Sequence, residues 1–279
     1  MKYLKLTQGK EMPLIGFGTF LLNGEECENS VLNAINTGYR LIDTAEAYGN
    51  EKEVGNAIKK SGIDREDLYI VTKLNYKNYE REQAIKSLEQ SLANLQTDYI
   101  DLVLLHWPFA NYYEAYSVLE DYYKSGKIKA IGVSNFEPDR LIDLYHYSDI
   151  KPSINQIETN IVNQQQEANK WLNKYNVAHM SYAPFGQGKI NEIYDNEVLV
   201  KFAQKYNKTT RQIVLRFFIE RNIPVIPKTA DVKRMKENFD IFDFELTEEE
   251  IKSIENLNKN TSVVGSSENP NLVEMSFNW

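Results

Sequence analysis

Cysteine is almost absent from the sequence: Cys27 is the single one, so the chain cannot form an internal disulfide bond. Such low cysteine usage is compatible with a reducing compartment. The sequence also has no apolar run long enough to span a membrane, and its N-terminus lacks the apolar core of a signal peptide. We therefore expect a cytoplasmic protein with no membrane partner.

Several familiar binding motifs are missing as well. There is no CxxC, no HExxH and no dense cluster of aspartate and histidine, so we expect no metal site. There is no P-loop, and Gly16-Phe17-Gly18 lacks the third glycine of the dinucleotide fingerprint, which argues against a Rossmann fold. The net charge is −8 and the positive charges are scattered, which argues against nucleic acid as a partner. We expect a monomer that acts on a small molecule.

One stretch organises what the sequence does contain. The aliphatic run 100–105 has no clean alternation, which is typical of a strand buried on both faces of a parallel sheet. It ends in His106-Trp107-Pro108, and Pro108 cannot extend a central strand. A polar side chain, His106, is therefore expected where a buried strand opens towards solvent.

The same pattern recurs along the chain. Predicted strands alternate with predicted helices, and the strand ends recur about every 30 residues, the length of a βα unit. Eight such units predict a (β/α)₈ TIM barrel, with a short N-terminal β-hairpin over 3–12 and extra helices near the C-terminus. A doubly wound open sheet is the alternative. No linker divides the chain, so we expect one domain over 1–279, with an irregular tail after 258; whether its last residue, Trp279, covers the active site stays open.

In such barrels the chemistry lies at the C-terminal ends of the strands. Every predicted strand from the second to the last ends in polar or ionisable side chains: Asp43, Lys73, His106, Ser134, Asn135, Asn155, Gln156, Tyr182 and Lys228. Exposure to solvent explains any one of these residues. An aspartate, a lysine and a histidine at three consecutive strand ends favour a catalytic site instead.

The motifs at these strand ends resemble those of the aldo-keto reductase family over about residues 3–258. The matching stretches include Arg40-Leu41-Ile42-Asp43-Thr44-Ala45, Tyr48-Gly49-Asn50-Glu51, Leu105-His106-Trp107-Pro108 and Ile226-Pro227-Lys228-Thr229. The resemblance implies a barrel that binds NADPH without a Rossmann fold and reduces aldehydes or ketones. It also implies a catalytic tetrad of Asp43, Tyr48, Lys73 and His106.

Elementary chemistry agrees with these assignments. No side chain donates hydride, so a nicotinamide must supply it, and Tyr48 can supply the proton. A free tyrosine has a pKa of about 10, and we expect the Lys73 ammonium to lower it while Asp43 keeps Lys73 charged. His106 is expected to hold the substrate carbonyl by a hydrogen bond, although its protonation state cannot be read from the sequence.

The resemblance also implies how the cofactor binds. Ser134, Asn135 and Gln156 resemble the residues that bind the nicotinamide carboxamide, and Tyr182 resembles the aromatic side chain that stacks on the ring. The adenosine end is expected at a second group, which comprises Lys228, Thr229, Arg234, Glu237 and Asn238. Two cations and a hydroxyl suit a 2′-phosphate, so we expect a preference for NADPH over NADH.

The substrate is expected to be a small carbonyl compound. Phe20 and Trp107 are predicted to line its pocket, and a small aldehyde, a dicarbonyl or a sugar-derived carbonyl would all fit. Two other functions stay open: a nucleotide-binding redox sensor on the same fold, and a lyase that forms a Schiff base through Lys73. The nearby Asp43 favours a charged lysine, which argues against the lyase.

Overall fold

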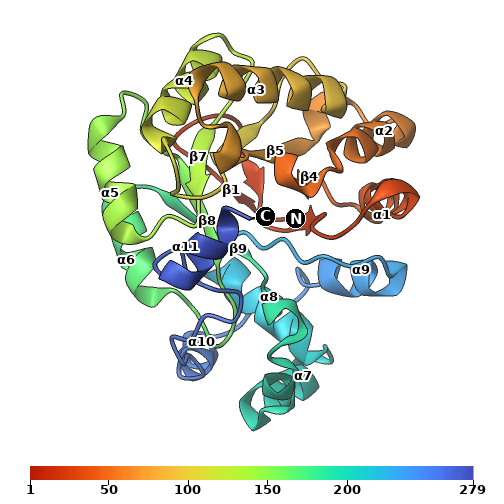
Figure 1. Cartoon of the computed structure of the whole chain (residues 1–279). Helices are drawn as coiled ribbons and strands as arrows, with labels where there is room; N and C mark the ends of the chain where they lie inside the picture. Colours follow the sequence, from red (N-terminus) through yellow and green to blue (C-terminus); the bar gives the residue numbers. More distant parts are fainter. Residues whose placement is uncertain (279) are drawn as a thin grey trace.

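Seven parallel strands form the centre of the molecule. The computed structural model describes residues 1–278, and Figure 1 shows the strands ringed by helices. The sheet follows the order of the chain, with each strand paired to the next: β3 (Gly16–Gly18), β4 (Leu41–Asp43), β5 (Tyr69–Leu74), β6 (Leu102–Leu105), β7 (Ile131–Ser134), β8 (Ile154–Glu158) and β9 (Ala178–Tyr182). The expected N-terminal hairpin is present, because β1 (Tyr3–Leu4) pairs with β2 (Met12–Pro13) in antiparallel orientation.

The ring is closed by segment 224–227, where the sequence predicts an eighth strand. The Gly16 N–H donates to the Val225 carbonyl at 2.9 Å, and the Ser181 N–H donates to the Pro224 carbonyl at 2.8 Å. The segment thus bridges β3 and β9, but it forms isolated bridges rather than a regular strand. Pro224 and Pro227 have no N–H to donate, so the ladder cannot extend. The predicted eighth strand therefore lies where it was expected, between β3 and β9, but it does not have the regular hydrogen bonding of a strand.

Helices cover the outside of this ring. Eleven α-helices lie in residues 1–278: α1 (Gly24–Thr37), α2 (Glu51–Ser61), α3 (Arg81–Leu95), α4 (Tyr112–Lys124), α5 (Pro138–Tyr147), α6 (Gln166–Lys174), α7 (Glu197–Tyr206), α8 (Thr210–Glu220), α9 (Val232–Phe239), α10 (Glu248–Glu255) and α11 (Pro270–Ser276). Helix α10 begins with a capping box formed by Thr247 and Glu250. None of the helices in this part of the chain is long and apolar enough to cross a membrane.

Helix α11 was not predicted, because the tail after 258 reads as irregular. Pro270 opens the helix, and the Asn269 side chain accepts a hydrogen bond from the Asn271 N–H. Both are ordinary signals of a helix start. Trp279, whose place over the active site the sequence leaves open, lies outside the described residues.

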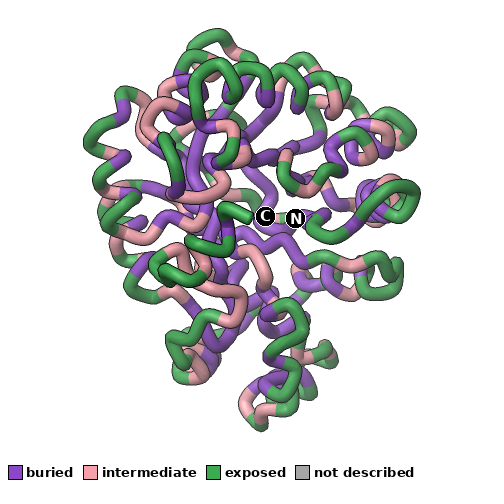
Figure 2. Tube along the Cα trace, in the orientation of Figure 1, coloured by how far each residue is buried: buried purple, intermediate pink, exposed green. Residues whose placement is uncertain are grey.

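The barrel interior is packed with side chains rather than open. Figure 2 shows the buried residues along the strands and the exposed residues on the outer helices. One apolar cluster fills the inside of the ring and includes Leu41, Val71, Leu104, Ile154 and Met180, and a larger one lies between the strands and the helices. The polar strand ends therefore stand on a rigid apolar base.

Replacing Gly55 with alanine should destabilise this packing. A Cβ there would meet the backbone of α3, where the Asn94 carbonyl oxygen lies closest and the Leu95 carbonyl carbon lies at 2.9 Å. Alanine gains about 1 kcal/mol in helix propensity, whereas overpacking costs about 1–3 kcal/mol. We expect a net loss of about 1 kcal/mol in the free energy of unfolding, measured by urea denaturation.

The exposed Lys59 on the same helix provides the control. Lys59→Ala should change the free energy of unfolding by no more than about 0.5 kcal/mol. A Gly55→Ala variant as stable as the wild type would contradict the close approach of α2 and α3.

Candidate active site

Three strand ends bring an ion pair and an imidazole together. Lys73, on β5, donates from Nζ to the Asp43 Oδ1 at 2.6 Å and to the Thr44 carbonyl at 2.9 Å. Lys73 and Asp43 are each 1% exposed. A charge pair this deeply buried is retained only where its members satisfy one another, and its fixed geometry suits a catalytic group.

Tyr48 lies directly above this pair. It belongs to the short 3₁₀ helix η1 (Glu46–Tyr48) that follows β4. The Lys73 Nζ is 5.1 Å from the centroid of the Tyr48 ring, and the centroids of the Tyr48 and His106 rings are 5.7 Å apart. The structure therefore brings together all four residues that the sequence predicts as a tetrad.

The electrostatics of Tyr48 differ from the expectation. Burial and the Asp43 carboxylate raise the pKa of Tyr48 well above its ordinary value, whereas we expected Lys73 to lower it. The cost of burying a phenolate close to the Asp43 carboxylate outweighs the attraction of the Lys73 ammonium, whose own pKa is lowered by burial. Tyr48 is thus held in its protonated form at neutral pH, which suits a proton donor.

His106 is held in its neutral form. Burial and the nearby Lys73 lower the pKa of His106 to about 3. A neutral imidazole still carries one N–H and can donate a hydrogen bond to a carbonyl oxygen. This environment favours the neutral form, where the sequence left the protonation state open, so His106 can donate a hydrogen bond but has no imidazolium proton to deliver as an acid.

The ring of His106 should therefore not titrate near neutrality. Its pKa of about 3 lies below the ordinary 6.5, so lowering the pH from 8 to 5 leaves the imidazole neutral. We expect the His106 ring signals in a proton–carbon NMR titration to stay in place over that range, with the assignment made by His106→Gln. A titration midpoint between pH 6 and 7 would contradict this environment.

The expected carboxamide-binding residues are linked to one another. Tyr182 donates from its hydroxyl to the Asn135 Oδ1 at 2.6 Å, and Asn135 donates from Nδ2 to the His106 carbonyl at 2.9 Å. Asn135 takes a left-handed backbone conformation with φ of 62°, which asparagine tolerates. Gln156 donates from Nε2 to the Asp43 Oδ2 at 2.7 Å. Amide and hydroxyl groups thus line one side of the tetrad.

The expected adenosine-binding group is only partly assembled. Lys228 and Arg234 are exposed, and within residues 1–278 neither forms an ion pair, so both cations are available to a phosphate. The Thr229 Oγ1 accepts from the Asp231 N–H, whereas the Glu237 carboxylate accepts from Thr209 on the neighbouring helix. Asn238 is buried beside these residues on α9. The two free cations fit the phosphate of an NADPH molecule.

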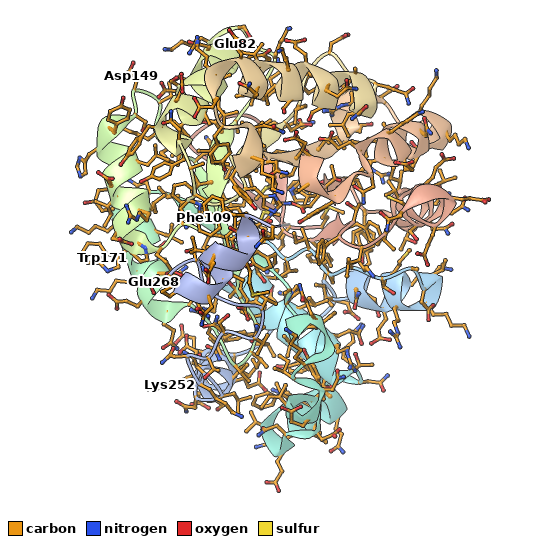
Figure 3. The ribbon with its side chains drawn as sticks, in the orientation of Figure 1. Glu82, Phe109, Asp149, Trp171, Lys252 and Glu268 are labelled. Atoms are coloured by element: carbon orange, nitrogen blue, oxygen red, sulfur yellow. The ribbon has the colours of Figure 1, made fainter. Side chains whose placement is uncertain are left out.

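Aromatic side chains form the open side of the site. Phe20, 42% exposed, has its ring centroid 5.1 Å from that of Tyr48. Trp107 stacks on Phe109 with an interplanar angle of 10°, and Phe109 packs against Tyr76. The Tyr76 hydroxyl in turn donates to the Ser276 carbonyl of α11, and Figure 3 shows Phe109 close to that helix. The unpredicted helix α11 therefore joins the rim that Phe20 and Trp107 were expected to form.

Two residues that fix the site were missed in the sequence. Tyr79 accepts from the Trp107 N–H and donates to the Trp107 carbonyl, so it holds the chain just after His106; as one of 18 tyrosines it gives no signal. Asn50 stands at the N-cap of α2, but its side chain makes no capping hydrogen bond there. It instead donates to the Thr19 and Leu22 carbonyls and so fixes the loop that carries Phe20.

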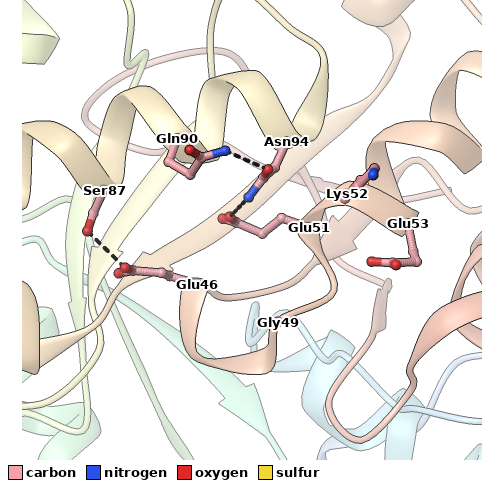
Figure 4. A pocket seen from close by; sticks show the side chains of 8 residues that line it. All are labelled: Glu46, Gly49, Glu51, Lys52, Glu53, Ser87, Gln90 and Asn94. Atoms are coloured by element: carbon pink, nitrogen blue, oxygen red, sulfur yellow. Dashed lines mark hydrogen bonds between the residues drawn. The ribbon is translucent and has the colours of Figure 1, made fainter.

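A pocket of about 260 Å³ lies behind the turn of Tyr48, between α2 and α3 (Figure 4). Its acidic residue Glu46 accepts hydrogen bonds from the Asn75 N–H, Asn78 and Ser87, which anchors η1 to the next βα unit. No group of three or more His, Cys, Asp or Glu side chains in residues 1–278 is placed to hold a metal ion. Glu46, at the edge of this pocket, thus supports the Tyr48 turn from outside the barrel.

The fold and the site define an enzyme of the (β/α)₈ class with a Tyr–Lys–Asp–His constellation at the strand ends. The Aldo/keto reductase family model matches residues 14–259, so the chain belongs to the aldo/keto reductase family. This membership confirms the expected carbonyl-reducing oxidoreductase and its (β/α)₈ barrel.

Individual relatives cover almost the whole chain. Glyoxal reductase of Bacillus subtilis is 41% identical over 98% of this chain and 97% of its own length. An aldo-keto reductase from a Medee basin deep-sea metagenome superposes with a TM-score of 0.93 at 42% identity, covering 95% of this chain and 98% of that one. A Bombyx mori aldo-keto reductase solved in complex with NADP is 35% identical, with a TM-score of 0.89 and 95% of each chain covered.

Proposed function

We propose that this protein reduces small dicarbonyl compounds, of which glyoxal is the simplest, with NADPH. The observation that carries the proposal is the buried Lys73–Asp43 pair beneath Tyr48 and beside His106 at the strand ends. The similarity to a glyoxal reductase and to an NADP-bound reductase supports the substrate class and the cofactor. The aromatic rim and the neutral His106 favour small uncharged carbonyls over charged ones.

Each tetrad residue has a distinct task in this proposal. NADPH, when bound, supplies the hydride. Tyr48, protonated because of its burial, donates its proton to the carbonyl oxygen, and the Lys73 ammonium 5.1 Å from the ring stabilises the phenolate that results. His106 donates a hydrogen bond that orients the carbonyl, and Asp43 fixes Lys73. Trp107 and Phe20 exclude water from the reacting atoms.

The cofactor would be held along two groups of residues. Ser134, Asn135 and Gln156 present hydroxyl and amide groups to the carboxamide, and Tyr182 presents its ring to the nicotinamide. A second group binds the adenosine end and the 2′-phosphate, with Lys228 and Arg234 as the cations and Thr229, Glu237 and Asn238 beside them. The exposed, unpaired state of the two cations is what supports this placement.

Neutralising the cations should remove the preference for NADPH. Arg234→Ala and Lys228→Ala should each raise the Kd for NADPH about tenfold or more, because each loses a charge-assisted contact worth about 1.5–3 kcal/mol, while the Kd for NADH changes little. Binding is measured by titrating the protein fluorescence. The exposed Lys236 on the same helix provides the control. Equal affinities for the two cofactors in the wild type would contradict the assignment.

The Schiff-base alternative fits the geometry less well. Lys73 is 1% exposed, and its ammonium donates to both Asp43 and the Thr44 carbonyl. A lysine that attacks a carbonyl needs a free, accessible amine. Borohydride should therefore trap no substrate on Lys73.

A panel of carbonyl compounds with NADPH tests the proposed function. Glyoxal, methylglyoxal, a simple aldehyde and an aldose are compared by their kcat/KM, and we expect the two dicarbonyls to be the best substrates. If the protein binds NADPH but oxidises the bound NADPH with none of these carbonyl compounds, it is a sensor rather than a reductase.

We further propose that residues 1–279 act as a single domain and a monomer in the cytoplasm, without a metal or nucleic acid.

A further inference from the structure

We propose that Gln156 positions the Asp43 carboxylate and so holds the Lys73–Asp43 pair in register beneath Tyr48. Gln156 was expected only to bind the cofactor carboxamide. In the structure its amide nitrogen instead reaches across the barrel from β8 to β4. The inference deepens the proposed function and rests on it for its catalytic consequence.

Both oxygens of Asp43 are engaged, each by a different partner. Oδ1 accepts from the Lys73 Nζ at 2.6 Å, and Oδ2 accepts from the Gln156 Nε2 at 2.7 Å. Among the described residues, Gln156 provides the hydrogen bond that reaches Oδ2. Because Asp43, Lys73 and Gln156 are each 1% exposed, water cannot take its place easily. Two fixed partners leave the carboxylate one orientation, the one that faces Lys73.

The amide of Gln156 is itself held in a defined orientation. A carboxylate only accepts hydrogen bonds, so the nitrogen of the amide must face Asp43. The same nitrogen lies 3.3 Å from the Met180 sulfur on β9, and the Ser134 hydroxyl donates to the Gln156 backbone carbonyl at 2.8 Å. Since the nitrogen faces Asp43, the amide oxygen is directed elsewhere. One side chain can thus serve Asp43 with its nitrogen and a carboxamide with its oxygen.

The ionisable groups around Asp43 give this link its importance. Lys73 from β5 donates to the carboxylate, and its Nζ lies 5.1 Å from the Tyr48 ring of η1. The His106 ring, after β6, lies 5.7 Å from that ring in turn. If Asp43 rotates, the ammonium loses its partner and its place beneath the Tyr48 ring. Gln156 would then act on proton transfer through Asp43, without touching the reacting atoms.

A double-mutant cycle separates this role from cofactor binding. Gln156→Met keeps the length of the side chain and removes the N–H, and it is combined with Asp43→Asn. At saturating NADPH and carbonyl, Gln156→Met should lower kcat about tenfold in the wild-type background, because one hydrogen bond to a charged group is lost. In the Asp43→Asn background the same change should lower kcat less than about twofold. Lys228→Ala, an exposed residue that touches neither Asp43 nor Gln156, should raise the Kd for NADPH without this coupling.

Unfolding of the protein without cofactor provides a readout that does not depend on activity. Gln156→Met should lower the urea midpoint in the wild-type background more than in the Asp43→Asn background. The exchanged pair Gln156→Glu with Asp43→Asn restores a carboxylate–amide hydrogen bond in reverse. It should therefore be more stable than Gln156→Glu alone, which sets two carboxylates against each other. This comparison remains decisive if Gln156→Met folds poorly.

Different outcomes would overturn the positioning role of Gln156 and the proposed function. Equal effects of Gln156→Met in both backgrounds, or a change confined to the Kd for NADPH, would overturn the positioning role. A wild-type protein that reduces no carbonyl would overturn the proposed function, and the unfolding comparison would still decide whether Gln156 and Asp43 are coupled.

Discussion

Tyr48→Phe should lower kcat for carbonyl reduction by roughly 10²–10⁴-fold, the usual contribution of a positioned general acid. The change removes the hydroxyl and keeps the ring that packs against Phe20, His106 and the Lys73 ammonium. The Kd for NADPH should stay within a few-fold of the wild type. Steady-state kinetics and a fluorescence titration measure the two quantities.

The control for this variant is a tyrosine far from the tetrad. Tyr147, at the end of α5, is 69% exposed, and Tyr147→Phe should leave kcat unchanged. If Tyr48→Phe keeps its kcat within tenfold of the wild type, Tyr48 is not the acid, and another group or water delivers the proton.

Breaking the buried ion pair should have the largest effect on stability. Lys73→Met leaves the Asp43 carboxylate buried with no cation beside it, which costs about 3–5 kcal/mol in the free energy of unfolding. It should also abolish turnover, because nothing then balances the phenolate of Tyr48. The double variant Lys73→Met with Asp43→Asn removes both charges, so it should recover most of the stability and none of the activity.

An exposed pair provides the matched comparison. Arg81 and Asp121 lie about half exposed, so Arg81→Met should cost no more than about 1 kcal/mol. Urea unfolding and kcat are measured for all variants. If Lys73→Met is as stable as the wild type, or if the double variant regains turnover, the buried Lys73–Asp43 pair does not have the structural and catalytic roles assigned to it.

The barrel and three of the four tetrad residues could be predicted because their signals are local. A buried aliphatic run that stops at a polar residue marks a strand end, and Asp43, Lys73 and His106 each follow such a run. Strands of one parallel barrel open at the same end, so residues far apart in the chain are expected to meet there. The pattern of strand ends was therefore enough to place these three side chains at one end of the barrel, whereas Tyr48 was assigned through the family resemblance.

What could not be predicted depends on contacts across the closed ring. Gln156 and Asp43 are 113 positions apart, and no local pattern tells which oxygen or nitrogen faces which. The direction of the Tyr48 pKa shift was predicted wrongly, because the sequence shows the nearby cation but not the burial of the Tyr48 hydroxyl or its closeness to the Asp43 carboxylate. Asn50 stands at a helix start, where a local cap is the ordinary role of asparagine, whereas its side chain cross-links two loops. The structure was needed wherever a side chain has several possible partners and the sequence does not show which of them it contacts.

The central claim is that Tyr48 protonates a carbonyl while NADPH is consumed, and a single turnover tests it most directly. The wild-type complex with NADPH is mixed rapidly with glyoxal or methylglyoxal, and NADPH oxidation is followed together with the alcohol formed. One alcohol should form for each NADPH oxidised, and the rate should fall at least about 10²-fold in Tyr48→Phe. An unchanged rate in Tyr48→Phe, or NADPH that stays reduced with every dicarbonyl, would contradict this claim.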